Sequence, residues 1–332
     1  KEKISPSGIS KSRMVHKGDF LLTNSMSFGR PYILNIDGCI HDGWLVISPI
    51  PKTYDPEFLY YLLSSGFAYS QFTEAASGGV VSNLNSDKVG NSLFPLPPQS
   101  EQKRIVSELE KLFKAIRLID NNKLLIRHNI EQIRSKILEL AISGKLVHQN
   151  TSDEPAIELL KRINPAYKSA DNRHYENVPK GWAVCTFEDI LEYEQPQQYI
   201  VNSADYSDEY EIPVLTAGKS FIIGRTDEKS GICKHLPVII FDDFTTDSKY
   251  VDFPFKVKSS AMKILHAKGN VNPKYVAYLM SVTRLVGDTH KRYWISEYSK
   301  IPIMLPPVNE QERIVSLIEK IYDRLDKILA EL

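Results

Sequence analysis

Apolar residues recur with heptad spacing through the middle of the chain. From residue 105 to residue 140, eleven positions are separated alternately by four and three residues, and Lys123 is the only polar one. The ten apolar positions are Ile105, Leu109, Leu112, Ile116, Ile119, Ile126, Ile130, Ile133, Ile137 and Leu140. A repeat of 3.5 residues sustained over this length is typical of a coiled coil. The pattern predicts a long central helix over residues 99–144, with Gly144 at its C-terminal end.

The head of this helix occurs a second time near the C-terminus. Residues 96–111 (LPPQSEQKRIVSELEK) match residues 305–320 (LPPVNEQERIVSLIEK) at 11 of 16 positions, with an offset of 305 − 96 = 209. The second copy keeps the heptad spacing at Ile314, Ile318, Ile321, Leu325 and Ile328. Each helix could instead bury one face against a globular domain. Because the two segments share one register and offer each other a partner, we favour a coiled coil between them.

Each copy of the helix follows a segment with mixed helix and strand character. Short β-prone runs, separated by Gly, Pro and Asn, occur at residues 20–22, 32–36 and 44–47, and again at 214–216, 221–223, 238–241 and 262–265. A helix opened by proline follows at Pro56 and again at Pro273. We therefore predict an α/β (α+β) fold in which long helices separate two globular domains.

The predicted organisation has five parts. Residues 1–98 form a first globular domain and residues 99–144 the central helix, while residues 145–180 form a linker with a short helix. Residues 181–306 form a second globular domain, and residues 307–332 form the C-terminal helix, which repeats residues 98–122. About 90 residues separate Trp182 from Pro273, but only 55 precede Pro56. We therefore expect the first domain to be incomplete at its N-terminus.

Composition narrows the functional class only slightly. The 332 residues are 42% hydrophobic and 25% charged, and we find no apolar run long enough to cross a membrane. The three cysteines are scattered and fit unpaired thiols in the reducing cytoplasm. The net charge is zero, but residues 256–300 hold nine Lys or Arg against two acids. This uneven charge leaves nucleic-acid binding open, although an ordinary solvated surface would look the same.

The sequence contains no convincing catalytic motif. Gly218-Lys219-Ser220 resembles the end of a phosphate-binding loop but lacks its first glycine, and none of the eight histidines has a metal-binding spacing. Asp242-Asp243 after a strand allows the hypothesis of a Mg²⁺-dependent nuclease, although paired acids at a strand end more often cap a turn. We predict a binding protein that has no metal or cofactor of its own.

The duplicated arrangement resembles the specificity (S) subunit of type I restriction-modification enzymes. The resemblance rests on Leu96-Pro97-Pro98 with Glu101-Gln102-Lys103-Arg104-Ile105, and on Leu305-Pro306-Pro307 with Glu310-Gln311-Glu312-Arg313-Ile314. It also includes Ile142-Ser143-Gly144-Lys145-Leu146 and Val178-Pro179-Lys180-Gly181-Trp182. In that family each globular domain is a target recognition domain that reads half of a split DNA sequence. The family's two helices pair antiparallel and hold these domains a fixed distance apart.

The resemblance also implies partners. Two methyltransferase (M) subunits dock on such a subunit and carry S-adenosylmethionine and the adenine-methylating site, and a motor-nuclease (R) subunit can join them. The chain itself would then be a non-catalytic bacterial DNA-binding protein of the cytoplasm that grips double-stranded DNA while its partners perform the chemistry. The alternative is a stand-alone coiled-coil DNA-binding or scaffold protein that needs no methyltransferase.

Residues that could contact DNA are those able to reach base edges or phosphates from polar loops. In the first domain we predict Lys11, Arg13, Asn24, Ser25, Ser27, Arg30, Ser77, Gly78, Gly79, Asn83 and Asn85. In the second domain we predict Thr216, Lys219, Ser220, Arg225, Thr245, Thr246, Ser248, Lys249, Lys291, Arg292 and Tyr293. Simple surface turns would explain the same loops without any DNA.

Overall fold

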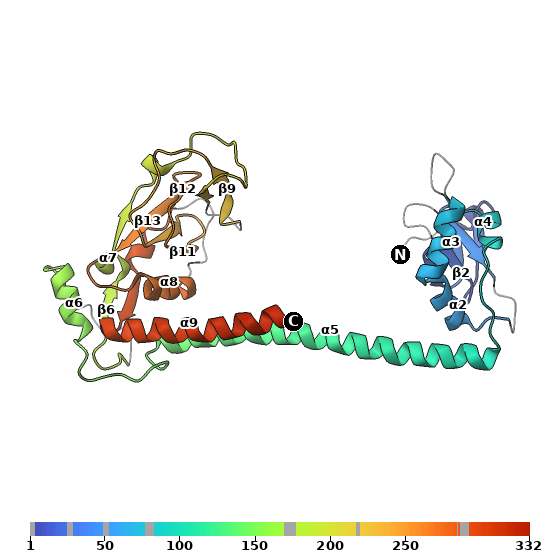
Figure 1. Ribbon diagram of the computed structural model, residues 1–332, viewed down its shortest axis with the longest axis horizontal. Helices are drawn as coiled ribbons and strands as arrows, with labels where there is room; N and C mark the ends of the chain where they lie inside the picture. The colour runs from blue at the N-terminus through green and yellow to red at the C-terminus, as the bar shows by residue number, and fades with distance from the viewer. Residues whose placement is uncertain are drawn as a thin grey trace. The chain divides into compact units, whose positions relative to one another are not determined.

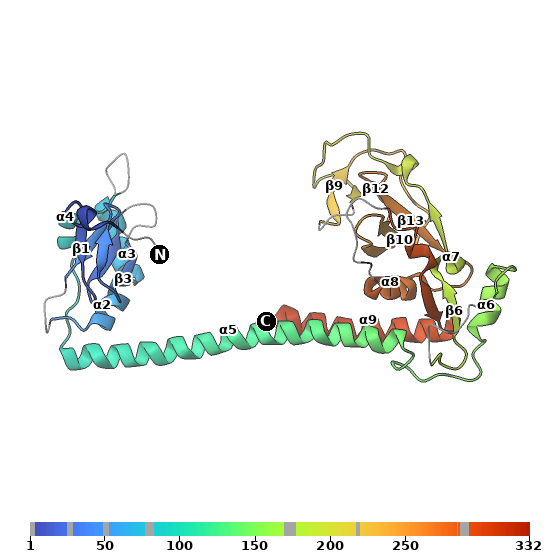
Figure 2. The ribbon, with the colours of Figure 1, turned by 180° about the vertical axis from the view of Figure 1, so that it is seen from behind.

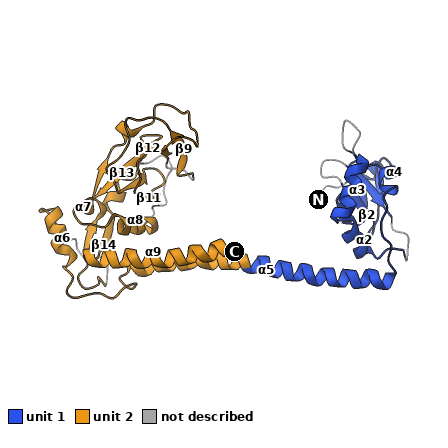
Figure 3. Cartoon of the chain, in the orientation of Figure 1, with its two compact units in different colours: residues 1–122 blue, residues 123–332 orange. Residues whose placement is uncertain are grey.

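The chain divides into two compact units, residues 1–122 and 123–332 (Figure 3). The computed structural model describes residues 4–24, 29–48, 53–76, 83–168, 177–216, 220–283, 285 and 292–332. Both units combine helices with small sheets, which confirms the predicted mixed α/β fold (Figure 1). None of the helices in the described ranges has the length and apolar character that a bilayer crossing requires.

Unit 1 is built on a three-stranded antiparallel sheet with the order β3-β2-β5. Its central strand is almost fully buried, and Phe20 and Leu22 pack against the helices that follow the sheet. A separate pair of strands, β1 and β4, lies outside this sheet. The strands are β1 (Arg13–Val15), β2 (Phe20–Thr23), β3 (Pro31–Ile33), β4 (Gly38–Ile40) and β5 (Trp44–Ile47). The short helices are α1 (Pro6–Ile9), α2 (Pro56–Leu63), α3 (Gly66–Ala76) and α4 (Ser86–Gly90).

Unit 2 has a larger sheet of the same kind, with the order β11-β10-β13-β7. Two smaller sheets, β12-β8-β9 and β14-β6, complete its strands. The strands are β6 (Ala183–Thr186), β7 (Leu191–Glu194), β8 (Ile212–Leu215), β9 (Ile222–Thr226), β10 (Val238–Asp242), β11 (Ser248–Val251), β12 (Lys256–Val257), β13 (Met262–Ala267) and β14 (Pro302–Leu305). The helices are α6 (Ala156–Ile163), α7 (Phe187–Ile190), α8 (Pro273–Val282) and α9 (Val308–Glu331), with 3-10 turns η2 (Gln197–Tyr199) and η3 (Tyr298–Lys300).

The three strands of the sheet in unit 1 correspond to three of the four strands of the sheet in unit 2. In unit 1, Phe20 of β2 pairs with Ile47 of β5, and in unit 2, Ile239 of β10 pairs with Leu265 of β13. All of these pairings are antiparallel, and the strand on the other side of the centre is β3 in unit 1 and β11 in unit 2. The sequence repeat of the long helices therefore extends to the cores of both globular parts.

The proline-started helices α2 and α8 begin in the same way. The side chain of Asp55 accepts hydrogen bonds from the backbone N–H groups of the second and third residues of α2. Asn272 makes the equivalent bonds at the start of α8. In both helices proline occupies the first position, where its missing N–H costs no hydrogen bond. Both helices begin at the prolines from which the sequence predicted them.

The long helix α5 (Gln99–Ile142) lies within the residues predicted for the central helix. Its part inside unit 2, from Lys123 onward, lies beside α9 in both views (Figures 1 and 2). The two segments run antiparallel, because Lys123 donates a hydrogen bond to the carbonyl oxygen of Leu332 while Arg134 forms an ion pair with Asp326. Tyr322 also donates its hydroxyl to the carbonyl of Arg134, at 3.3 Å.

The heptad interface differs in part from the prediction. Ile130 and Ile137 of α5 are buried with Ile314, Ile318 and Leu325 of α9, but Ile133 is 45% exposed and Ala141 is buried instead. The buried face therefore follows positions 130, 137 and 141, because it turns toward the core of unit 2 at the C-terminal end of α5. The predicted positions Ile105, Leu112, Ile116, Ile119, Ile126 and Ile328 are also exposed, and Leu109, Leu140 and Ile321 are half-buried.

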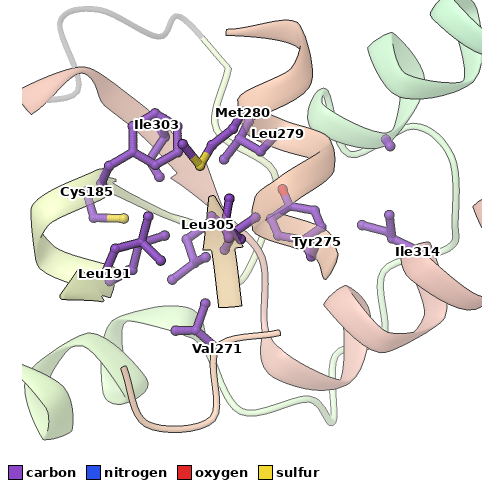
Figure 4. Packing of buried hydrophobic residues seen from close by; sticks show 14 of the residues in the cluster. Cys185, Leu191, Val271, Tyr275, Leu279, Met280, Ile303, Leu305 and Ile314 are labelled. Atoms are coloured by element: carbon purple, nitrogen blue, oxygen red, sulfur yellow. The ribbon is translucent and has the colours of Figure 1, made fainter. Parts of the chain in front are cut away.

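The larger of two apolar clusters in unit 2 lies next to the long helices, and a second cluster lies around β8, β11 and β12. Strands β6 and β14 and helices α7, α8 and α9 all contribute buried side chains to the larger cluster. Figure 4 shows Cys185 and Leu191 beside Ile303 and Leu305, with Tyr275 of α8 close to the same group. Burial raises the pKa of the Cys185 thiol and of the Tyr275 phenol, so both remain neutral.

Candidate nucleic-acid interface

Two loops that are distant in sequence are joined in each unit. In unit 1 the backbone N–H of Leu84 donates to the carbonyl of Asn24 at 3.0 Å. In unit 2 the N–H of Tyr293 donates to the carbonyl of Asp243 at 2.9 Å. Leu84 and Tyr293 are equivalent by the repeat offset of 209 (293 − 84 = 209), and Asn24 and Asp243 each come directly after the central strand of their sheet. Each unit thus brings together two of the polar loops predicted to contact DNA.

The turn between β10 and β11 is the better described of these sites. Asp243 is buried, and its Oδ1 accepts the backbone N–H of Trp294 at 2.8 Å. Its Oδ2 lies 3.4 Å from the Nζ of Lys263, which also donates to Gln195 Oε1 at 3.1 Å. A buried carboxylate held by a cation on one oxygen and by a backbone N–H on the other is a stable anchor, because its charge is compensated on both oxygens. Asp243 therefore fixes residues 293–294 to the sheet.

Both carboxylate oxygens of Asp242 also accept hydrogen bonds within the turn. Its Oδ1 accepts the N–H of Phe244 at 2.9 Å, and its Oδ2 accepts the hydroxyl of Thr245 at 2.7 Å. Among the described residues, no group of three or more His, Cys, Asp or Glu side chains is arranged to hold a metal ion. The hypothesis of a nuclease that uses Asp242 and Asp243 thus gains no support from their geometry, since both carboxylates serve the turn.

Thr246 and Tyr293 are among the residues predicted to contact DNA, but their side chains are buried. Thr246 is 1% exposed, has a positive φ of 58°, and its Oγ1 accepts the N–H of Leu285 at 3.4 Å. Tyr293 is 4% exposed and belongs to the core of unit 2. Both side chains therefore pack in the interior of unit 2. A β-branched residue with positive φ is uncommon and marks a tightly constrained turn.

Most other described members of the predicted set reach solvent. The exposed ones are Lys11, Arg13, Arg30, Asn83, Asn85, Ser220, Thr245, Lys249 and Arg292. Asn24, Thr216, Arg225 and Ser248 are half-buried. Some already have structural partners, since Asn85 caps α4 and Arg225 donates to the carbonyl of Glu211 at 2.8 Å. Ser25, Ser27, Ser77, Gly78, Gly79, Lys219 and Lys291 lie outside the described residues.

Two of the cations predicted to contact DNA in unit 2 lie over aromatic rings. The Nζ of Lys249 lies 4.9 Å from the centre of the Phe221 ring, and the guanidinium carbon of Arg292 lies 5.8 Å from the centre of the Phe244 ring. Such contacts restrict a long side chain while leaving its charge available to an anion. Phe221 and Phe244 are not among the residues predicted to contact DNA. Their position next to predicted polar residues was the only available signal.

In unit 1 the predicted cations Lys11 and Arg13 line a groove of about 1050 Å³. His41 and Trp44 lie on the same groove, together with the carboxylates of Asp37 and Asp42. A groove that combines cations, an aromatic residue and hydrogen-bonding groups offers the chemistry that phosphate and base contacts need. Arg13 belongs to β1, where it pairs with Ile40 of β4, so the backbone at this position is held by a sheet.

A glutamine in the repeated motif attaches the long helix in each unit. Gln102 is fully buried, and its Oε1 accepts the N–H of Asp55 at 2.6 Å, directly at the cap of α2. Gln311 is also fully buried and accepts the N–H of Asn272, the cap of α8, at 2.8 Å. Both amides donate to the carbonyl of a motif proline, Pro97 or Pro306, at 2.9 Å. The motif is recognisable in the sequence, but the role of its glutamine becomes visible only in the structure.

An aromatic pair adds to the same attachment. Tyr61 of α2 stacks on Phe113 of α5 with ring centres 5.6 Å apart. The equivalent residues of unit 2, Tyr278 and Tyr322, meet at 6.2 Å. Burial raises the pKa of Tyr322 to about 12. Each unit is thus fixed to its repeated helix by a buried glutamine and an aromatic contact in matching positions.

Comparison with known proteins gives the family of the chain. Residues 3–127 and 179–332 match the family model described as "Type I restriction modification DNA specificity domain". The specificity subunit of the type I restriction enzyme EcoR124I/EcoR124II from Escherichia coli is 48% identical over 153 residues, which cover 43% of this chain and 38% of that protein. The EcoEI specificity subunit, also from Escherichia coli, is 26% identical over 245 residues, covering 60% of this chain and 40% of that protein. The chain thus spans about two-fifths of the length of these two relatives.

Two solved structures share the fold. The HsdS subunit from Thermoanaerobacter tengcongensis superposes with a TM-score of 0.57 at 18% identity, covering 96% of this chain and 76% of that one. A chain from a structural study of complex assembly and conformational transition of the type I R-M system gives a TM-score of 0.62, also at 18% identity, with 96% and 77% covered. At this identity the likeness shows the fold alone.

Proposed function

The chain belongs to the type I restriction-modification DNA specificity family, and from this membership we propose that it is the DNA sequence-specificity subunit of a type I restriction-modification enzyme. Unit 1 and the globular part of unit 2 each read one half of a two-part target in double-stranded DNA. The observation that carries this proposal is the repeated joining of two polar loops, through Leu84 and Asn24 in one unit and through Tyr293 and Asp243 in the other. Two equivalent sites in one chain suit a target with two half-sites.

The residues proposed to contact DNA fall into two groups. Lys249 and Arg292 bear exposed charges on aromatic supports, which suits phosphate contacts that position the duplex. Hydrogen-bonding side chains at the same loops, such as Asn83 and Thr245, are exposed and suit base-edge contacts. The anchoring role of Asp243 suits this arrangement, since base readout needs side chains held on a rigid base.

The repeated helices serve a second purpose in this proposal. A continuous helix such as α5 is a stiff element, and the buried glutamines attach each unit to its copy of the motif. We propose that the helices set the spacing of the half-sites and form the surface on which two methyltransferase subunits dock. Those partners would bind S-adenosylmethionine and methylate adenine, and a motor-nuclease subunit could join them. The chain would then perform no catalysis itself and would act in the bacterial cytoplasm.

Co-expression with the cognate methyltransferase subunit, followed by long-read mapping of methylated bases, tests the proposal. We expect one two-part motif with a spacer of fixed length, methylated only when both proteins are present. Purification of the complex serves as the control, because it shows that the subunits have assembled. Unmodified DNA in cells that contain the assembled complex would contradict the proposal. Duplex binding by this chain alone, without any methyltransferase partner in the complex, would favour a stand-alone DNA-binding protein.

A further inference from the structure

In the described part of the chain, the outer edge of strand β5 in unit 1 is unpaired. The equivalent edge in unit 2, on β13, is paired with another strand. In unit 2, β7 pairs antiparallel with the outer edge of β13, so that Tyr193 is opposite Leu265. All four residues from Met262 to Leu265 are buried. In unit 1, all four residues of β5 are only half-buried, and no strand in the described part of the chain pairs with its outer edge. Unpaired main-chain N–H and C=O groups at a sheet edge readily bind another strand.

An apolar groove of about 420 Å³ lies along the same strand in unit 1. It is lined by apolar side chains of β5 and α2 and by residues around α4. The members used here are Ile47, Leu59, Leu63, Val89, Gly90 and Phe94. Close to it along the chain, Leu93 is 80% exposed and Leu96 is 55% exposed. Unit 1 thus presents apolar surface next to an open sheet edge.

The internal repeat shows what covers the equivalent surface in unit 2. The offsets of the repeat place the six groove residues at Leu265, Val276, Met280, Tyr298, Ser299 and Ile303. Tyr298 stacks on Phe187 with ring centres 5.2 Å apart, and Ser299 donates its hydroxyl to Glu188 at 3.2 Å. Ile303 pairs with Cys185, as Leu265 does with Tyr193. The covering segment is therefore β6–α7–β7, residues 183–194, part of which appears in Figure 4.

We propose that the groove of unit 1 receives a strand–helix–strand segment of the same kind, which enters unit 1 ahead of α1 as residues 183–194 enter unit 2 ahead of β10. Its second strand pairs antiparallel with β5, and one helical turn places two apolar side chains in the groove, as Phe187 and Ile190 do in unit 2. Its first strand lies beside Leu93 and Leu96. That pairing is shorter than β6–β14, because Pro95 has no N–H to donate.

The observations favour this occupant over a second copy of the chain. The only segment of the required pattern in the described part of the chain is residues 183–194, and it already pairs with β13 and β14. A copy could therefore fill the groove of another only by opening its own core, in which Phe187 and Ile190 are completely buried. The proposal does not depend on DNA binding, since it rests on the groove and the repeat alone.

Hydrogen exchange with a synthetic peptide of residues 178–195 of this chain tests the fit. We expect saturable binding of one peptide per chain, with slower exchange of the amides of residues 44–48. The variant Gly90→Phe should weaken binding at least tenfold, because Gly90 lines the groove and a Cβ built there meets no atom within 4 Å. Gly66→Phe is the matched control, since Gly66 is equally open but lies outside this groove, and it should bind like the wild type.

Three results would overturn the proposal. Absence of saturable binding would exclude the fit, and binding that Gly90→Phe leaves unchanged would place the peptide elsewhere. Protection of residues 44–48 that rises with protein concentration when no peptide is present would show that a second copy fills the groove. A peptide with Phe187→Ser and Ile190→Ser should not bind, because it lacks the apolar pair.

Peptide mapping of the protein isolated from its native cells tests the source of the segment. We expect residues ahead of α1 that contain two apolar strands separated by one helical turn. A native protein that begins close to α1, with residues 44–48 protected by a different polypeptide, would contradict this source even if the peptide binds.

Discussion

Replacing Gln311 by Ala should destabilise unit 2 strongly, although the side chain is polar. Gln311 is fully buried, and its amide accepts the N–H of Asn272 at 2.8 Å and donates to the carbonyl of Pro306 at 2.9 Å. The Ala side chain would leave both backbone groups buried without a partner. Each such loss costs about 1–3 kcal/mol, so we expect a decrease of about 2–6 kcal/mol in the free energy of unfolding.

Urea denaturation of the full chain measures this change, and hydrogen exchange locates it. The amides at the start of α8 should exchange faster in Gln311→Ala, because the N–H of its cap residue Asn272 loses its acceptor. The control is Gln132→Ala, since Gln132 is exposed and its amide bonds to another exposed side chain, His128, at 3.0 Å. The control should change stability by less than about 0.5 kcal/mol.

The repeat provides a second form of the same experiment. Gln102→Ala in unit 1 removes three hydrogen bonds, to the N–H of Asp55 and to the carbonyls of Thr53 and Pro97. It should speed exchange at the start of α2 and leave α8 unchanged. If Gln311→Ala and Gln102→Ala behave like Gln132→Ala, the glutamines do not attach the units to their helices, and the reasoning fails.

Three further predictions follow from burial and charge. Ile137→Ala should cost about 2–4 kcal/mol of stability and Ile133→Ala less than about 1, since only Ile137 is buried; equal losses in urea denaturation would contradict the observed interface. The hydrogen bond from Arg313 lowers the pKa of Asp153 below its usual 3.8. The ionised carboxylate therefore stabilises the folded protein fully above pH 3.8, and this contribution is lost as the pH falls through the lowered pKa. The melting temperatures of wild type and Asp153→Asn should therefore differ at pH 6 and converge as the pH is lowered below 3.8, and a constant difference would refute this assignment. Arg292→Ala should reduce the salt dependence of DNA binding by about one phosphate contact, measured as the slope of log K against log salt, with similar loss on all sequences; an unchanged slope would remove Arg292 from the interface.

The long helices could be predicted because their pattern repeats many times. The heptad spacing of apolar residues over Ile105–Leu140 predicts a long helix, and the second copy of its start at Leu305 predicts a similar one. Neither prediction needs tertiary information. Which heptad positions are buried was harder to predict. Ile133 is exposed while Ala141 is buried, because α5 packs against the core of unit 2 as well as against α9. That core is assembled from residues distant in sequence.

The candidate site could be predicted at the level of loops but not of side chains. The sequence selected the loops around Asn24, Asn83, Thr245 and Arg292, and the structure joins them in pairs. It could not show that Thr246 points into the protein, because its backbone has a positive φ that a threonine rarely adopts. Strands β6 and β7 were missed because a capped helical turn, α7, divides the segment that contains them.

The central claim is that each half of the chain reads its own half of the target. The measurement that tests it most directly is methylome mapping of cells that express the cognate methyltransferase with either the wild-type chain or the double variant Lys249→Ala, Thr245→Ala. Thr245 lies in the β10–β11 turn of unit 2 and Lys249 in β11, and both residues are exposed. We predict that the variant methylates less efficiently and relaxes one half of the motif, while the other half and the spacer length stay unchanged. Relaxation of both halves together, or an altered spacer, would contradict the account.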